Sequence, residues 1–279
     1  MLRQLLITAD DLGANPPRSH GIFLCIEQGL VTGAGLLPNG GDSDQAGKRA
    51  RERRVSCGQH LARTSGEPLS PAETVERLLL PNGAFAGLRE FERRLKNDEI
   101  DATHLEREIR AQLEWCLDVH GQPTHLSSVD HVHCHPSLIT VITPILLRYG
   151  IFKVRIPSEP LPPFGYEIPE AELAIARDIT ARADAARERY AAEGITGTDT
   201  FRGLTLVGRV SAKNFRHTMS RLPNEGSIEL MVHPGAPTPI GTDFDIDPQR
   251  QTELQTLTDP TAAALLAKMK VTRATYADL

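Results

Sequence analysis

Short apolar segments alternate with longer amphipathic or charged segments along most of the chain. Their length, their β-branched content and the Gly and Pro residues beside them favour strands over helices. We expect strands at Leu5–Ala9, Val31–Leu37, Val55–Leu61, Thr124–Val129, Lys153–Pro157, Leu204–Gly208 and Ile228–Pro234.

The segments between these strands carry the pattern of helices. Predicted helices cover Ser19–Gln28, Asp42–Arg53, Ala102–Val119, Pro136–Tyr149, Glu170–Glu193, Ala212–Leu222 and Pro260–Met269. Asp259 is the expected N-cap of the last helix, with Pro260 at its first position. Two stretches rich in Pro and Gly, Ser65–Asn97 and Pro157–Tyr166, are expected to be long functional loops.

The alternation of strand and helix predicts parallel strands joined by right-handed crossovers. About seven such units indicate an α/β fold in which residues 1–279 form a single-domain, distorted or incomplete (β/α) TIM-like barrel. An open doubly wound sheet is the alternative.

Composition and charge narrow the class of protein. The chain has 279 residues, of which 40% are hydrophobic and 24% charged, as in ordinary globular proteins. A net charge of −5 argues against nucleic acid or an anionic membrane as the main partner. No run of about 20 apolar residues is present, and the N-terminus lacks a signal-peptide pattern, so we expect a cytoplasmic location. The four cysteines are scattered and are expected to be reduced.

Aspartate and histidine residues follow several of the predicted strands. They are Asp10 and Asp11 after the first strand, His60 at the end of the third, His131, His133 and His135 after the fourth, and His233 at the end of the last. Each alone has an ordinary explanation, such as a helix cap or a packed histidine. Together they indicate one site at the carboxyl edge of the sheet, where parallel α/β folds build active sites. Mixed carboxylate and imidazole ligands point to a divalent metal, Zn²⁺ or Mg²⁺.

Five segments resemble the YdjC-like carbohydrate deacetylases, a family that includes the chito-oligosaccharide deacetylases. They read LLITADDLG, HGIFLCIEQGLVTGAGLLPNG, GQHLARTSGEPL, PTHLSSVDHVHCHP and ELMVHPG, in the family's order and spacing. EIRAQLE, HCHP and RIPSEPL are most similar to the branch associated with hopanoid lipid biosynthesis. The resemblance implies a distorted barrel, a divalent metal, a homodimer and hydrolysis of the N-acetyl group of an amino sugar.

The resemblance also implies roles for individual residues. Asp11 and His60 correspond to metal ligands, Asp10 to a catalytic acid/base and His233 to a catalytic histidine across the site. Further residues are expected to bind substrate: Arg155, whose alternative is a surface salt bridge, His133, Asn39 and Asp130.

The family's third metal ligand is a histidine, and this chain has Val129 at that position. The family aspartate two residues earlier is Ser127 here. If the strand continues regularly, His131 lies on the same face as Val129 and is the expected replacement, with His133 and His135 at the rim. A vacant third position, with a weakly bound metal or none, is the alternative.

Three functions are consistent with these residues. The first is a metal-dependent hydrolase that deacetylates an N-acetylated sugar or glycoconjugate. The second is a YdjC-like barrel with an altered metal site that performs a different reaction in a biosynthetic pathway. The third, a non-catalytic sugar-binding relative, is disfavoured by retention of Asp10, Asp11, His60 and His233.

Overall fold

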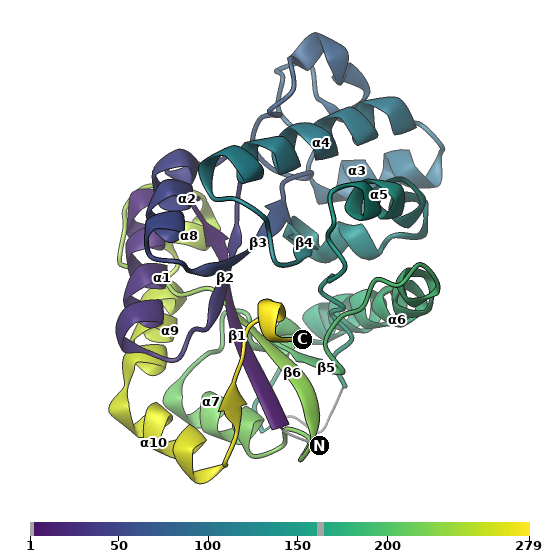
Figure 1. The fold of residues 1–279 in the computed structure, drawn as a ribbon. Coiled ribbons are helices and arrows are strands. Elements are labelled where there is room, and N and C mark those ends of the chain that lie inside the picture. The colour runs from purple at the N-terminus through teal and green to yellow at the C-terminus, as the bar shows by residue number, and fades with distance from the viewer. Residues whose placement is uncertain (1–2, 161–164) are drawn as a thin grey trace.

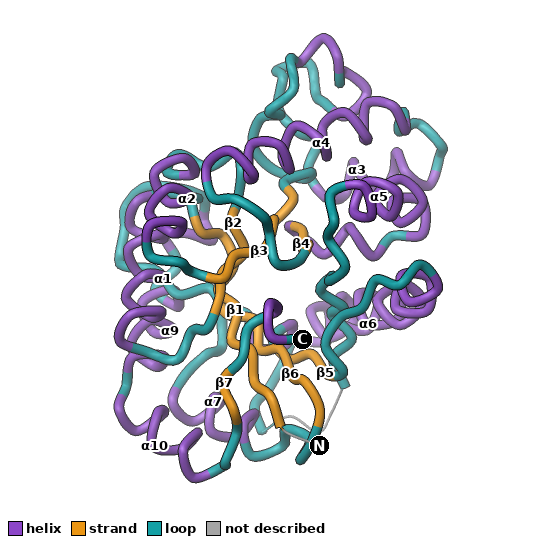
Figure 2. The backbone as a smooth tube through the Cα atoms, in the orientation of Figure 1, coloured by secondary structure: helices purple, strands orange, loops and turns teal. Residues whose placement is uncertain are grey.

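The sheet of this protein is parallel in each described pairing and curls on itself (Figures 1 and 2). The computed structural model describes residues 3–160 and 165–279. The strands lie in the order β4–β3–β2–β1–β6–β5, and β7 pairs with the start of β1. Their bounds are β1 Arg3–Leu12, β2 Gly33–Leu36, β3 Ser56–Leu61, β4 Leu126–Ser128, β5 Thr200–Arg202, β6 Gly226–Val232 and β7 Thr272–Arg273.

Two isolated β-bridges extend the curved sheet from β4 toward β5. Leu126 pairs in parallel with Val154, and Lys153 pairs in parallel with Thr196, shortly before β5. Single bridges therefore take the place of full strands in this part of the ring. The result is the distorted, incomplete (β/α) barrel that the strand–helix alternation predicts, rather than an open doubly wound sheet.

Most of the predicted helices form close to their expected bounds. Asp101 caps α4 by accepting from the backbone N–H of Thr103, and Asp259 caps α10 in the same way. The helices are α1 Pro16–Gln28, α2 Ser43–Glu52, α3 Leu88–Lys96, α4 Ala102–Val119, α5 Pro136–Arg148, α6 Glu170–Ala192, α7 Ala212–Met219, α8 Asp243–Ile246, α9 Gln249–Thr258 and α10 Pro260–Lys268.

Some expectations about secondary structure were wrong. The predicted strand Leu204–Gly208 contains a short 3₁₀ helix, because Gly203, at φ 138°, turns the chain away from the sheet just after β5. The predicted loop Ser65–Asn97 contains α3, and α9 was not predicted. Of the expected loop Pro157–Tyr166, residues 161–164 lie outside the described part of the chain.

Alternate residues of β1 face the helices and the barrel interior. Leu5, Ile7 and Ala9 belong to a large apolar core with residues of α1, α2, α7, α9 and α10. Leu6 instead packs with Ala274 and Tyr276 from the C-terminal segment. A second apolar core lies under α3, α4, α5 and α6. Burial of apolar side chains thus occurs mainly outside the barrel and leaves its interior to polar residues.

The C-terminal segment, drawn in yellow in Figure 1, runs on from β7 beside the start of β1 and reaches Glu229 of β6 through Tyr276. The ring of Tyr276 stacks on His125, with centroids 3.8 Å apart and an angle of 18° between the planes. Gly58 of β3 makes this stack possible, since a Cβ at that position would lie 2.3 Å from the His125 ring.

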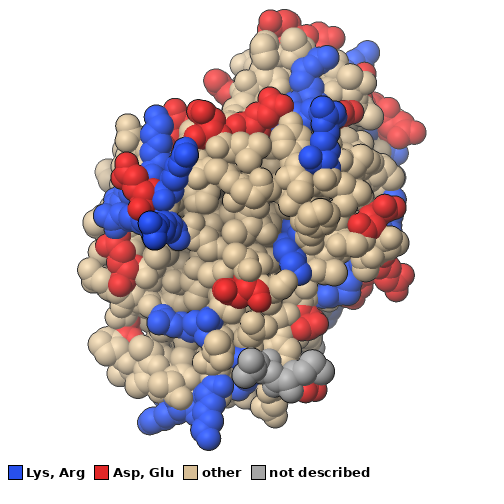
Figure 3. All heavy atoms as spheres, in the orientation of Figure 1, with Lys and Arg blue, Asp and Glu red and all other residues tan. Residues whose placement is uncertain are grey.

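Charges of both signs are interspersed on the face shown in Figure 3, around a broad uncharged centre. This face has no extended basic stripe of the kind that binds nucleic acid. Among the described residues, no helix combines the length and apolarity needed to cross a bilayer.

We predict that Gly58→Ala lowers the free energy of unfolding by about 1–3 kcal/mol, because the added methyl group overpacks the His125–Tyr276 stack. Urea denaturation followed by circular dichroism measures the change. Gly41→Ala is the matched control, since its Cβ would meet only one atom, the Ala14 carbonyl oxygen at 3.9 Å. Equal stability of the two variants would contradict the packing argument.

Candidate active site

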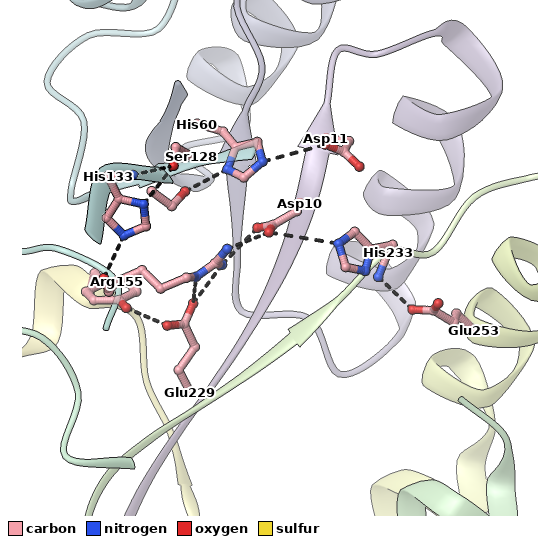
Figure 4. A network of polar contacts seen from close by, with 11 residues as sticks. Asp10, Asp11, His60, Ser128, His133, Arg155, Glu229, His233 and Glu253 are labelled. Carbon is pink, nitrogen blue, oxygen red and sulfur yellow. Dashed lines mark hydrogen bonds and ion pairs between the residues drawn. The ribbon is translucent and has the colours of Figure 1, made fainter. Parts of the chain in front are cut away.

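Two aspartates and two histidines from the ends of β1, β3 and β6 lie close together (Figure 4). Nε2 of His60 is 3.7 Å from Oδ1 of Asp11, and Nε2 of His233 is 4.0 Å from Oδ2 of Asp10. The Asp10 side chain is 2% exposed, whereas that of Asp11 is 19% exposed. The site therefore has a buried carboxylate and a more accessible one.

A local irregularity in β1 sets the directions of the two adjacent aspartates. The pairing of β1 with β2 shifts register between Ala9 and Leu12, and Asp11 has a left-handed backbone with φ 67°. In a regular strand, adjacent side chains point to opposite faces. The irregularity is thus the local feature that distinguishes the Asp10–Asp11 pair from ordinary strand neighbours.

Arg155 holds the buried carboxylate in place. Its Nη1 and Nη2 donate to the two carboxylate oxygens of Asp10 at 2.5 and 2.8 Å. Its Nε and Nη2 also donate to Oε1 of Glu229 at 3.0 and 2.8 Å. Arg155 is 0% exposed, so the alternative of a surface salt bridge was wrong, whereas its substrate contact stays a prediction. Its donors are occupied by two buried acids.

The pKa values of Asp10 and His233 are both lowered, but for different reasons. Burial alone would raise the pKa of Asp10, but the charge and hydrogen bonds of Arg155 hold it well below its usual range. Burial lowers the pKa of His233 well below its usual range, although the Asp10 carboxylate opposes this. At neutral pH the site thus contains an ionised Asp10 facing a neutral His233.

Both backbone polar groups of His233 are held by charged side chains. Its N–H donates to Oε2 of Glu253 at 2.6 Å, and its carbonyl oxygen accepts from Nη1 of Arg18 at 3.1 Å. Phe244 of α8 meets the imidazole edge to face at 5.2 Å, and the guanidinium groups of Arg18 and Arg250 lie over the Phe244 ring. These contacts restrict the direction in which the imidazole points.

Ser127 supports His60. Nδ1 of His60 lies 2.8 Å from Oγ of Ser127, which leaves Nε2 directed toward Asp11. A serine hydroxyl can either donate or accept, so this contact does not fix which ring nitrogen of His60 carries the proton. A carboxylate at position 127 would accept only, and would fix Nε2 as the free ligand atom.

The segment after β4 departs from the regular strand expected from its alternating histidines. The strand ends at Ser128, and Asp130 and His131 adopt left-handed backbones at φ 54° and 55° within a 3₁₀ segment. The regular strand that would place His131 on the same face as Val129 therefore does not form. His135 instead caps α5 by accepting from the backbone N–H of Ser137.

His131 and His133 are both buried in this segment. His133 is fully buried, and its ring nitrogens lie 2.7 Å from Ser128 Oγ and 2.8 Å from the Arg155 carbonyl oxygen. Both ring nitrogens of His133 thus have partners within the protein, and its substrate contact stays a prediction. His131 meets the ring of Phe201 at 6.1 Å, and its buried Nδ1 has no hydrogen-bond partner within the described residues.

Asn39 and Asp130, predicted to bind substrate, both contact the loop that follows β3. Nδ2 of Asn39 donates to the carbonyl oxygens of Ser65 and Glu67, each at 2.9 Å. Oδ2 of Asp130 accepts from Oγ1 of Thr64 at 2.7 Å. Both residues therefore fix this loop.

Several residues that shape the site were not predicted from the sequence. Glu229 sits inside an apolar strand, and such a charged residue in a buried strand is a usable signal for a site. Glu253, Arg18 and Tyr276 carry no comparable signal, because their partners are distant in the sequence.

The residues present fit part of a metal site. Two ligands that each lie about 2.0–2.2 Å from one ion are themselves roughly 3–4 Å apart, which matches the 3.7 Å between Asp11 and His60. Val129 offers no donor atom, and in residues 3–160 and 165–279 no three His, Cys, Asp or Glu side chains are grouped as a ligand set. The role of His131 as the third metal ligand stays a prediction.

Comparison with known proteins identifies the family. The family model described as YdjC-like protein matches residues 4–268. The chain belongs to the YdjC-like family. This confirms the resemblance found in the sequence motifs, while the finer similarity to the hopanoid-associated branch stays a prediction.

Relatives of this YdjC-like chain extend over nearly its whole length. A Homo sapiens protein named carbohydrate deacetylase is 33% identical over 289 residues, covering 95% of this chain and 87% of the human protein. A Proteus mirabilis protein named chitooligosaccharide deacetylase is 24% identical and is covered in full, as is this chain. The crystal structure of a candidate cellobiose-phosphate cleavage protein from Enterococcus faecalis V583 is 21% identical, with a TM-score of 0.80 over 100% of this chain and 99% of that one. At this identity the structural match supports the fold alone.

We predict that Arg155→Gln lowers the free energy of unfolding by about 3–5 kcal/mol at pH 7, because it leaves two buried carboxylates without their cation. In the wild type, the pKa of Asp10 is held below its ordinary 3.8. Its pairing therefore stabilises the fold above about pH 4, and this contribution is lost as the pH falls through the depressed pKa. The free energies of unfolding of the wild type and of Arg155→Gln should therefore become more similar below about pH 4, as measured by urea denaturation at a series of pH values. A difference independent of pH would contradict this assignment.

Proposed function

We propose that this protein hydrolyses the N-acetyl amide of an amino sugar or glycoconjugate, releasing acetate and a free amine. The observation that carries the proposal is the pairing of Asp10 with His233 at one strand edge, beside Asp11 and His60. The names of the human and Proteus mirabilis relatives, carbohydrate deacetylase and chitooligosaccharide deacetylase, support the substrate class.

Asp10 and His233 divide the proton chemistry in this proposal. A water molecule attacks the acetyl carbonyl carbon and gives its proton to Asp10, which Arg155 holds in a single orientation. The neutral imidazole of His233 donates a hydrogen bond to the carbonyl oxygen as negative charge develops there. The proton held by Asp10 then passes to the amide nitrogen, and the C–N bond breaks to give acetate and the amine.

Asp11 and His60 would hold the divalent metal that the family resemblance implies. When bound, such an ion supplies Lewis acidity to the carbonyl oxygen and to the attacking water. The acids nearby favour a cation, since Asp10 and Glu229 share one arginine and Asp11 adds a further carboxylate.

Substrate is proposed to enter beside the loop that Asn39 and Asp130 hold. These two residues fix the loop from the ends of different strands, so a sugar hydroxyl near either would meet an oriented polar group.

The first test is release of acetate from N,N′-diacetylchitobiose, with and without added Mg²⁺ or Zn²⁺. Asp10→Asn should lower kcat by about 10²–10⁴-fold, because general acid–base catalysis typically contributes that factor. Asp98→Asn is the control, since Asp98 is an exposed residue in a left-handed turn that asparagine tolerates. Full activity of the Asp10 variant would refute the proposed role.

A different reaction on the same barrel is the second candidate. It is favoured by Val129 and Ser127, which replace a metal-binding histidine and an aspartate of the family pattern. These two changes weaken the metal site at the third ligand and at the support of His60.

We predict that the double variant Ser127→Asp with Val129→His binds Zn²⁺ about 10–100-fold more tightly than the wild type, because it restores a ligand and a support. Calorimetric titration measures the affinity, and Ser127→Asp with Val129→Leu is the matched control without the new donor. Tighter binding accompanied by faster acetate release supports deacetylation. Tighter binding with no acetate release favours the second candidate.

A further inference from the structure

The C-terminal segment is anchored inside the barrel by several contacts. The N–H of Ala274 donates to the carbonyl oxygen of Leu5 at 3.0 Å, which continues the pairing of β7 with β1. Thr275 and Asp278 form a reciprocal capping box around a short 3₁₀ turn. Tyr276 lies in this turn and is 3% exposed. The segment therefore presents one tyrosine to the interior in a fixed position.

The hydroxyl of Tyr276 has an acidic partner. It donates to Oε2 of Glu229 at 2.6 Å, while the tyrosine ring stacks on His125. Both the ring and the hydroxyl are thus engaged, and Glu229 has one of its oxygens occupied by a neutral donor.

The other oxygen of Glu229 leads to the proposed catalytic base. Oε1 accepts hydrogen bonds from Nε and Nη2 of Arg155, and Arg155 also donates to both carboxylate oxygens of Asp10. Tyr276, Glu229, Arg155 and Asp10 therefore form a continuous line of hydrogen bonds, and each member is at most 3% exposed. Figure 4 shows the part of this line that runs from Glu229 through Arg155 to Asp10.

One guanidinium shared by two carboxylates takes a position that depends on both. While Tyr276 donates to Oε2 of Glu229, only Oε1 accepts hydrogen bonds from Arg155. Without the hydroxyl, Oε2 would be a buried charged acceptor with no donor, which is unfavourable. Because Arg155 already donates to Oε1 of Glu229, we expect its guanidinium to move toward Oε2 of Glu229 and away from Asp10.

We propose that Tyr276 is a positioning residue for the reaction, acting through Glu229 to set the Arg155 fork against Asp10. The proposal rests on the function proposed above for Asp10. If Tyr276 only filled the barrel and stacked on His125, removal of its hydroxyl alone would leave kcat unchanged.

The test uses Tyr276→Phe in the full chain, which keeps the ring and removes only the oxygen. With N,N′-diacetylchitobiose we expect kcat to fall about tenfold with KM changed less than about twofold, since the loss affects the reacting groups rather than binding. Tyr149→Phe is the matched control, because the Tyr149 hydroxyl also donates to a carboxylate, Glu114 Oε1 at 2.7 Å, but on the outer surface. A kcat equal to that of an active wild type would overturn the proposal.

A spectroscopic measurement separates this proposal from the proposed function. The Nε–H signal of Arg155 in a ¹H–¹⁵N spectrum is assigned by its absence in Arg155→Lys. We expect this signal to shift in Tyr276→Phe and to stay in place in Tyr149→Phe, whether or not the sugar is a substrate. An unmoved signal in Tyr276→Phe would overturn the proposal, whereas a wild type that releases no acetate would count against the proposed function only.

Discussion

The buried ion pairs of Arg155 are the interaction on which the interior of this barrel depends. A charged side chain in a dry interior is costly unless it is paired and hydrogen-bonded, and Arg155 meets this condition through Asp10 and Glu229. Its donors reach across the barrel to β1 and β6, which are neighbours in the sheet. The same contacts orient the carboxylate proposed to do the chemistry, so stability and catalysis share one arginine.

The charge balance of this interior bears on the metal proposed for Asp11 and His60. Asp10 and Glu229 together exceed the single charge of Arg155, and Asp11 lies alongside with partial access to solvent. An ion near Asp11 and His60 would offset the surplus negative charge. In the proposed metal site Val129 supplies no ligand but leaves these charges unchanged, so the proposed ion would be held more by charge than by coordination number.

The sequence predicted the barrel and the residues at its carboxyl edge because both depend on local patterns. Apolar segments set the strands, and the ends of parallel strands meet at one edge, so Asp10, Asp11, His60 and His233 come together. The segment from His131 to His135 was mispredicted because two left-handed residues end the alternation that a strand would give. Arg155 and Tyr276 depend on partners far away in the sequence, which no local pattern encodes.

The polar network also bears on how the chain folds. Asp10 and Arg155 are 145 residues apart, and Glu229 and Tyr276 are 47 apart. Contacts between such distant segments form late, because loop closure must precede them. Until β1, β6 and the C-terminal segment have assembled, Glu229 and Asp10 face a partly formed interior without their full set of donors. The last steps of folding are therefore expected to be the ones that create the site.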